Sequence, residues 1–187
     1  MNCQYRGGYM KRILLIMLML LVPLQILAIS PSELYHESRY QRVYSDNKQV
    51  LFLDKESIQI VNKSIDGVTL SSRFYEYKNN GNIYSIMANF KYNNLYSKSN
   101  YISEIKRLYP NILSEDLVAL IRVRKAHNSG ILINISGASV FDYEGKLVTK
   151  GPLSKDDNTD VDLRYGDARY FVGNMAYSIL YGQAFDQ

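Results

Sequence analysis

Two adjacent β-forming segments constrain the fold most strongly, because they predict a long antiparallel hairpin. Val68–Tyr77 and Ile83–Tyr92 are rich in β-branched and aromatic residues, and the tetrapeptide Asn79-Asn80-Gly81-Asn82 separates them. An Asn-Gly pair supplies the positive φ angles that a two-residue hairpin turn requires. A turn centred on that pair places Tyr77 opposite Tyr84.

This register assigns the side chains of the hairpin to two faces, because side chains alternate along a strand. The face that carries Phe90 and most of the tyrosines is the more apolar, so we expect it to lie against the core. The face that carries Phe74 and Met87 is mixed and can face water. A binding platform is a second interpretation of the tyrosines Tyr75, Tyr77, Tyr84, Tyr92 and Tyr96. Ordinary β-sheet composition is the simpler explanation, and we adopt it.

The segments on either side of this hairpin predict further strands and helices. A helix is predicted at residues 99–108, which Pro110 ends. Residues 114–124 suit a helix with Ser114 at its N-cap, but they also suit a strand. Strands are predicted at residues 49–53, 60–61, 131–142 (with a bulge at Gly137) and 146–148.

The last predicted element is an amphipathic helix over residues 167–181. Asp167 suits its N-terminus, where a carboxylate interacts favourably with the helix dipole, and Gly182 suits the position after its last turn. The predicted apolar face consists of Ala168, Phe171, Val172, Met175, Ile179 and Leu180. Together these elements predict an α+β fold: an antiparallel β-sheet of about five to six strands with a C-terminal helix packed on one face.

Residues 1–28 are predicted to be a secretory signal peptide. Two basic residues precede an unbroken apolar run at residues 13–21, and Ala28 is a small residue at the expected cleavage site. Cleavage after Ser30 and an uncleaved membrane anchor are the alternatives. The run is shorter than the roughly 20 residues of a transmembrane helix, so we expect no membrane span after cleavage. Met10 is a better start for such a leader than the first residue.

Removing this leader changes the charge and the cysteine content of the chain. The leader holds three of the 22 basic residues and none of the 18 acidic ones, so the remainder carries 19 basic residues and a net charge of +1. A net charge this small argues against nucleic acid as a partner. The single cysteine, Cys3, also lies in the leader, which excludes disulfides and a thiol nucleophile. We expect residues 29–43 to be a linker or lead-in segment and 44–187 to be a single domain that is periplasmic, attached to the outer envelope or secreted.

An acidic loop before the last helix is the sharpest motif for a ligand. Its oxygen-bearing side chains have the spacing of positions 1, 3, 5, 7 and 12 of a calcium loop, in the order Asp156, Asn158, Asp160, Asp162 and Asp167. Val161 stands where such a loop needs glycine, and Arg164 places a cation among the ligands. We therefore adopt a solvated acidic loop, with a calcium-stabilised domain through residues 156–167 as the alternative.

The other polar residues do not form a recognisable catalytic set. His36 and His127 are the only histidines and lie in separate segments. Two pairs of carboxylates occur at predicted strand ends, Asp54 with Glu56 and Asp142 with Glu144. Acids are common there for solubility, so we expect neither an enzyme nor a cofactor, and the sequence singles out no binding residue.

Three short motifs resemble the surface-adhesin protein E group of small exported bacterial proteins. They are Phe52–Ile58, Ser139–Lys146 and the helical ending Ala176–Phe185 with its Tyr-Gly pair. The resemblance covers residues 44–187. It implies an antiparallel sheet with a flanking helix and a location in an envelope of the Gram-negative type. Adhesin activity belongs to a few members of the group, and the disulfide cysteines of some relatives are absent here.

These observations lead us to expect an exported protein of the bacterial envelope that acts as a non-enzymatic binding or adhesion module, with a protein or a surface ligand as its partner. The alternative is a small periplasmic or secreted enzyme or inhibitor without a recognisable motif. A deep pocket lined by Asp54, Glu56 or His127 would favour the enzyme. An uninterrupted core with shallow clefts would favour the module.

Overall fold

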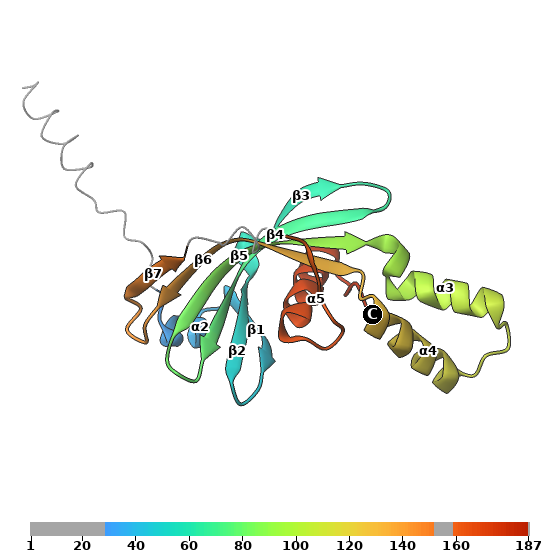
Figure 1. Ribbon diagram of the computed structural model, residues 1–187, viewed down its shortest axis with the longest axis horizontal. Helices are drawn as coiled ribbons and strands as arrows, with labels where there is room; N and C mark the ends of the chain where they lie inside the picture. Colours follow the sequence, from blue (N-terminus) through green and yellow to red (C-terminus); the bar gives the residue numbers. More distant parts are fainter. Residues whose placement is uncertain (1–28, 152–158, 187) are drawn as a thin grey trace, which may run out of the picture.

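The computed structural model describes residues 29–151 and 159–186, and its strands form one antiparallel sheet of eight strands (Figure 1). The fold class is α+β, as predicted. The predicted leader lies outside the described residues. In chain order the elements are α2 (Pro31–His36), β1 (Tyr40–Ser45), β2 (Gln49–Asp54), η1 (Lys55–Ser57), β3 (Gln59–Lys63), β4 (Gly67–Lys78), β5 (Ile83–Asn93), η2 (Asn94–Tyr96), α3 (Lys98–Leu108), α4 (Ser114–His127), β6 (Ile131–Phe141), β7 (Leu147–Gly151), β8 (Val161–Asp162) and α5 (Ala168–Tyr181).

The sheet divides into two halves because its long central strands have different neighbours at their two ends. The main order is β1-β2-β4-β5-β6-β7, while β3 pairs with β4 and β8 pairs with β6. Residues 74–78 of β4 pair with β2, and residues 68–71 pair with β3. One half therefore has the order β3-β4-β5-β6-β8, and this half carries the site described below.

The β4–β5 hairpin forms where the sequence predicts it, but its register differs by one residue. Tyr77 lies opposite Ile83, and Tyr84 lies opposite Glu76. The loop has three residues rather than two, because the Lys78 N–H donates to the Asn82 carbonyl at 3.0 Å. Gly81 has φ 86°, whereas no non-glycine residue of the described chain has a positive φ. A three-residue loop with glycine in the left-handed region replaces the predicted two-residue turn, so that prediction is wrong.

This shift of one residue exchanges the two faces of β4, whereas β5 keeps its predicted core face with Phe90. Phe74, Ile86 and Phe90 lie on the same face and belong to the main core, on which α5 packs. Tyr75 points to the opposite face, where it joins a second cluster with Leu34 of α2. The predicted core face is therefore correct for β5 and wrong for β4, where Phe74 instead of Tyr75 and Tyr77 belongs to the main core.

The final helix has the predicted ends, but only part of its predicted apolar face is buried. It begins after Asp167, which makes no side-chain capping bond, and it ends at Gly182 with φ 72°. Its buried residues are Tyr170, Val172, Gly173 and Ala176, whereas Phe171, Ile179 and Leu180 are 38–40% exposed. Small residues face the sheet because the helix lies close to it: a Cβ on Gly173 would lie 2.9 Å from the Phe90 ring. The hydroxyl of Tyr92 donates to the Gly173 carbonyl at 2.7 Å.

The predicted boundary between lead-in segment and domain is also wrong, because residues 29–43 are part of the folded structure. Ser30 and Glu33 form a capping box that starts α2. Leu34 of α2 is buried in the second cluster, and Tyr40 begins a strand that the sequence pattern did not reveal.

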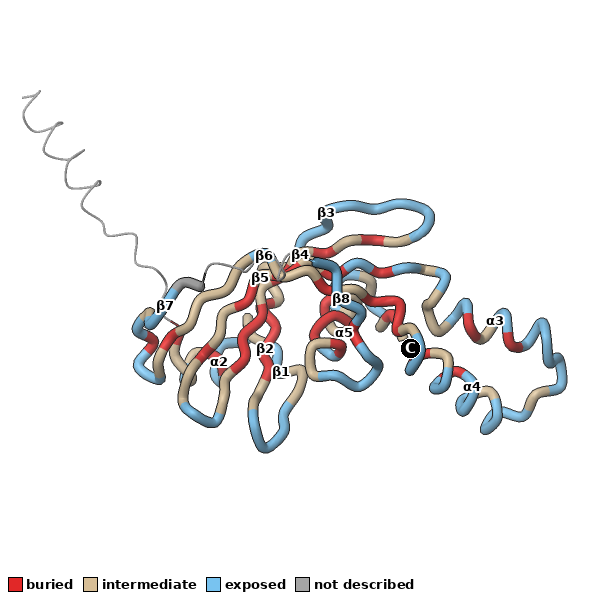
Figure 2. Tube along the Cα trace, viewed as in Figure 1, coloured by how far each residue is buried: buried red, intermediate tan, exposed pale blue. Residues whose placement is uncertain are grey.

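Helices α3 and α4 form a helical hairpin that projects away from the sheet (Figure 1). Residues 114–127 are helical, which decides between the two alternatives for this segment. The hairpin is inserted between β5 and β6, which are direct neighbours in the sheet. It has a small core of its own around Tyr101, Ile105 and Ile121, and its far end is largely exposed (Figure 2). Within the described residues, no helix combines the length and hydropathy needed to cross a membrane.

Candidate functional site

Two of the four carboxylates considered for catalysis, those of Asp54 and Asp142, make hydrogen bonds that hold the structure together. Asp54 is fully buried and accepts two hydrogen bonds from Arg39, at 2.7 Å from Nε and 2.6 Å from Nη2. This pairing raises the pKa of the Arg39 guanidinium above its ordinary value. Asp142 accepts the backbone N–H groups of Glu144 and Lys146 at 3.0 and 2.8 Å, which fixes the β6–β7 turn.

The two histidines lie far apart in the fold, on different elements. His36 ends α2, and its Nδ1 lies 2.8 Å from the Ser32 carbonyl oxygen, while His127 ends α4. Asp54, Glu56 and His127 do not line the groove described below or four other cavities of the described chain. Among residues 29–151 and 159–186, no three acidic, histidine or cysteine side chains are grouped to hold a metal.

The acidic motif is only partly described, since Asp156 and Asn158 lie outside the described residues. Position 6 of the motif lies in strand β8, an extended segment that pairs with β6 where a calcium loop would curl. Asp160 forms an ion pair with Lys91, with 2.5 Å between Oδ2 and Nζ. Asp162 accepts a hydrogen bond from Ser129, and burial raises the pKa of its carboxyl. Asp167 begins α5.

A buried ion pair that the sequence analysis missed joins α4 to the end of the chain. The Lys125 side chain is 1% exposed, and its ammonium donates to the carbonyls of Tyr96 at 2.5 Å and Ser129 at 2.7 Å. Its third partner is the carboxylate of Asp186, which also accepts from the Tyr170 hydroxyl. Burial lowers the pKa of Lys125. The ammonium has two carbonyl acceptors and one counter-charge, so we interpret this cluster as a structural clasp.

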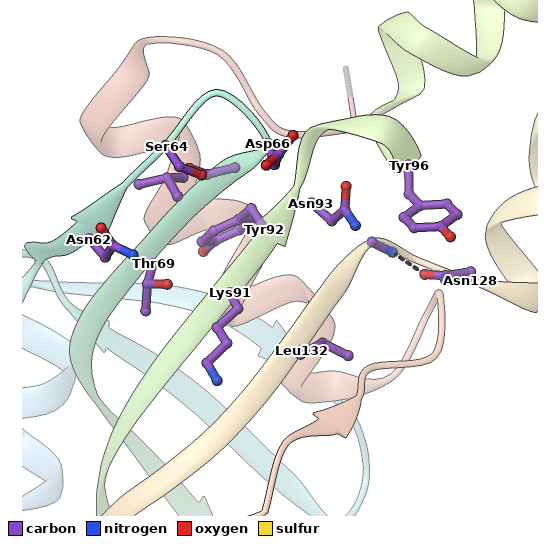
Figure 3. A pocket seen from close by; sticks show the side chains of 13 residues that line it. Asn62, Ser64, Asp66, Thr69, Lys91, Tyr92, Asn93, Tyr96, Asn128 and Leu132 are labelled. Carbon is purple, nitrogen blue, oxygen red and sulfur yellow. Dashed lines mark hydrogen bonds between the residues drawn. The ribbon is translucent and has the colours of Figure 1, made fainter.

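A groove of about 290 Å³ lies beneath the β3–β4 hairpin, on the face of the sheet opposite to α5 (Figure 3). We call it the polar groove and call that face the outer face. Most of its lining side chains carry an amide, a hydroxyl or a charge. The lining residues are Asn62, Ser64, Asp66, Gly67, Val68, Thr69, Lys91, Tyr92, Asn93, Tyr96, Asn128, Gly130 and Leu132.

Strand pairing brings these residues together. Asn62 pairs with Thr69, Thr69 with Lys91, and Lys91 with Leu132, so one row crosses four strands (Figure 3). Thr69, Lys91 and Leu132 lie on the outer face because their neighbours along the strands, such as Phe90, point into the core. Asn62 lies on the same face because it pairs directly with Thr69. Gly67 is required where the hairpin closes over β5, since a Cβ there would lie 1.9 Å from the Tyr92 carbonyl oxygen.

Several polar groups in the groove keep their hydrogen-bonding capacity. The side chains of Asn62, Asp66 and Thr69 make no hydrogen bond with another described residue. The Oδ1 atoms of Asn93 and Asn128 accept backbone N–H groups at 3.0 and 2.8 Å, which fixes both side chains and leaves their amide N–H groups available. Oriented donors and acceptors of this kind suit recognition of a polar ligand.

The tyrosine platform does not form as a unit. Tyr92 is buried under α5, and Tyr75 and Tyr77 pack near α2. Tyr92 and Tyr96 both line the polar groove, and the ring of Tyr96 lies beside Asn128 (Figure 3). The sequence signal that points to the groove is the alternation of polar residues along β5, at Asn89, Lys91 and Asn93.

Comparisons with protein-family models, with curated proteins and with solved structures found no match for this chain.

Proposed function

We propose that the protein is an exported, non-enzymatic binding module of the bacterial envelope, and that its ligand binds in the polar groove. The observation that carries the proposal is the outer face at the groove end of the sheet. The β3–β4 hairpin bounds the groove there, and the side chains of Asn62 and Thr69 have unused hydrogen-bonding groups. A side-chain amide or hydroxyl that is already oriented by strand pairing loses little entropy on binding.

The buried acids are paired with arginines and inaccessible to a substrate, which supports binding over catalysis. A general acid or base must reach its substrate at hydrogen-bond distance. Asp54 is fully buried and saturated by Arg39, and buried Glu76 accepts from Arg169 Nε at 2.8 Å. The only carboxylate in the groove is that of Asp66, which is exposed to solvent.

The leader-like N-terminus and the resemblance to the protein E group support the envelope location. Sequencing the N-terminus of the chain after expression in a Gram-negative host tests this part. We expect a product that begins at Ile29 in the periplasmic, envelope or culture-medium fraction. A product in the cytoplasm with its N-terminus intact would contradict export.

Binding is tested by cosedimentation of the exported protein with insoluble envelope fragments from a Gram-negative bacterium. The groove variant is Asn62→Ala/Thr69→Ala, and the matched control is Asn111→Ala in the exposed α3–α4 loop. We expect the native protein and the control to sediment and the groove variant to remain in solution. Equal sedimentation of all three proteins, or of none, would refute the groove as the binding surface.

A further inference from the structure

We infer that the ligand of the polar groove is a carbohydrate chain without net charge; this inference rests on the proposed function. The first argument is hydrogen-bond chemistry. A sugar hydroxyl is both a donor and an acceptor, and so are a side-chain amide and a threonine hydroxyl. Asn62 and Thr69 offer both kinds of group, while Asn93 and Asn128 present oriented amide donors.

The second argument is the spacing of these groups. Neighbouring strands lie about 4.8 Å apart, which is close to the length of one sugar ring, so a row across the strands can contact successive units. The row through Asn62 and Thr69 is followed by a second polar row. That row consists of Gln59, Ser71, Asn89 and Asn134. Two parallel polar rows fit an extended chain better than a single small molecule.

The third argument is charge. Lys91 is the only cation of the groove, and Asp160 neutralises it at 2.5 Å. An anionic polymer would need unpaired cations, and the exposed carboxylate of Asp66 would repel it. The groove therefore favours a ligand without net charge.

The fourth argument distinguishes a sugar from a peptide. A peptide that adds to a sheet needs a free strand edge, but β4 and β5, which carry Thr69 and Lys91 of the groove, are paired on both edges. Within the described chain, the unpaired edge of β3 is the edge away from β4, so strand addition there would place a peptide outside the groove. Leu132 is the only aliphatic side chain of the groove that is not buried, so pockets for apolar peptide side chains are lacking. The ring of Tyr96, at the end of the groove nearest the helices, can pack against the apolar face of a sugar ring (Figure 3).

The test is a titration of the isotope-labelled exported protein, followed by the chemical shifts of its backbone amides. The probes are a six-unit oligomer of N-acetylglucosamine, a six-unit oligomer of glucose, a six-residue peptide of serine, glycine and alanine, and inorganic polyphosphate. We expect at least one sugar oligomer to shift residues 62–69, 91–93 and 128–132, and the other two probes to leave them unchanged. Asn62→Ala/Thr69→Ala should weaken sugar binding at least tenfold, and Asn111→Ala should not weaken it.

The outcomes separate this inference from the proposed function. If the peptide or the polyphosphate shifts the groove and neither sugar does, the carbohydrate assignment is overturned while the groove remains a binding site. If no probe shifts the groove but envelope fragments still retain the protein through it, the assignment is overturned as well. If the fragments also fail to retain the protein, both proposals fall.

Discussion

The clasp at Lys125 gives the most quantitative prediction. Its ammonium is 1% exposed, holds two backbone carbonyls and forms an ion pair with Asp186. In Lys125→Met the carbonyls lose their donor, and the carboxylate keeps only the hydroxyl of Tyr170 in a buried position. Removing one partner of a buried ion pair typically costs about 3–5 kcal/mol, so we expect a loss of that size in the free energy of unfolding. This is a large part of the roughly 5–15 kcal/mol of a typical domain.

The measurement is urea unfolding followed by circular dichroism, with a double-mutant cycle. Asp186→Leu alone leaves the ammonium buried and without its counter-charge, while Lys125→Met/Asp186→Leu removes both charges. The double variant should therefore cost less than the sum of the two single variants by at least about 1 kcal/mol. The matched control, Lys106→Met on the exposed surface of α3, should change stability by less than about 0.5 kcal/mol. A loss below about 1 kcal/mol for Lys125→Met, or additive single effects, would refute the clasp.

Three further predictions concern the turn, the tyrosines and the acidic loop. Gly81→Val should destabilise the protein by about 1–2 kcal/mol, because Gly81 has φ 86° and a β-branched residue resists that conformation; an unchanged melting temperature would show that the turn assignment is wrong. Burial raises the pKa values of Tyr92 and Tyr170 in the folded protein, so the stability that they contribute is fully present below pH 10 and falls as the pH rises further. The lowered pKa of Lys125 has the opposite effect on stability, but only up to about pH 10.5, the ordinary pKa of lysine. Above that pH the free energy of unfolding should fall by about 2.7 kcal/mol per pH unit for the two tyrosines, which lowers the urea midpoint. A constant midpoint up to about pH 11.5 would contradict this prediction. The melting temperature should not change with millimolar calcium or with a chelator, and a calcium-dependent rise of several degrees would instead identify residues 156–167 as a binding site.

Most elements were predictable because turn and cap residues mark their ends. Pro110 follows α3, and Asp167 and Gly182 bound α5. The register of the β4–β5 hairpin was not predictable from these residues. An Asn-Gly pair fits a two-residue turn with two positive φ angles and a three-residue loop with one, and the two loops differ by a single residue in register. Pairing with β2 and β6 decides between them, and that pairing is not local.

The buried face of α5 was only partly predicted, for a different physical reason: Val172 is buried as expected, but Phe171 and Leu180 are exposed. Hydrophobic periodicity selects large apolar side chains such as Phe171 and Leu180, yet close approach to the sheet favours Gly173 and Ala176. Lys125 was missed for a similar reason, because a basic residue on a helix normally faces water. Its burial depends on a carboxylate 61 residues further along the chain.

The candidate site was beyond sequence reasoning because its residues are polar and dispersed. Asn62, Thr69, Lys91 and Asn128 come from four separate segments, and none of them belongs to a recognisable motif. Alternating polar residues on β5 predicted a solvated face, which is correct. That β3 folds over this face to form a groove follows from pairing between β3 and β4 and from the close approach at Gly67.

Because α3 and α4 are inserted between two paired strands, the helical hairpin is attached to the sheet at one end only. Helix α4 has 14 residues and is therefore about 21 Å long. Its pivot is the clasp, where Lys125 holds the carbonyl before α3, the carbonyl after α4 and Asp186. A rotation of about 10° at this pivot displaces the far end by roughly 4 Å over that length. A small change in the angle of α4 would therefore give a displacement at its far end that a pair of distance labels can measure directly.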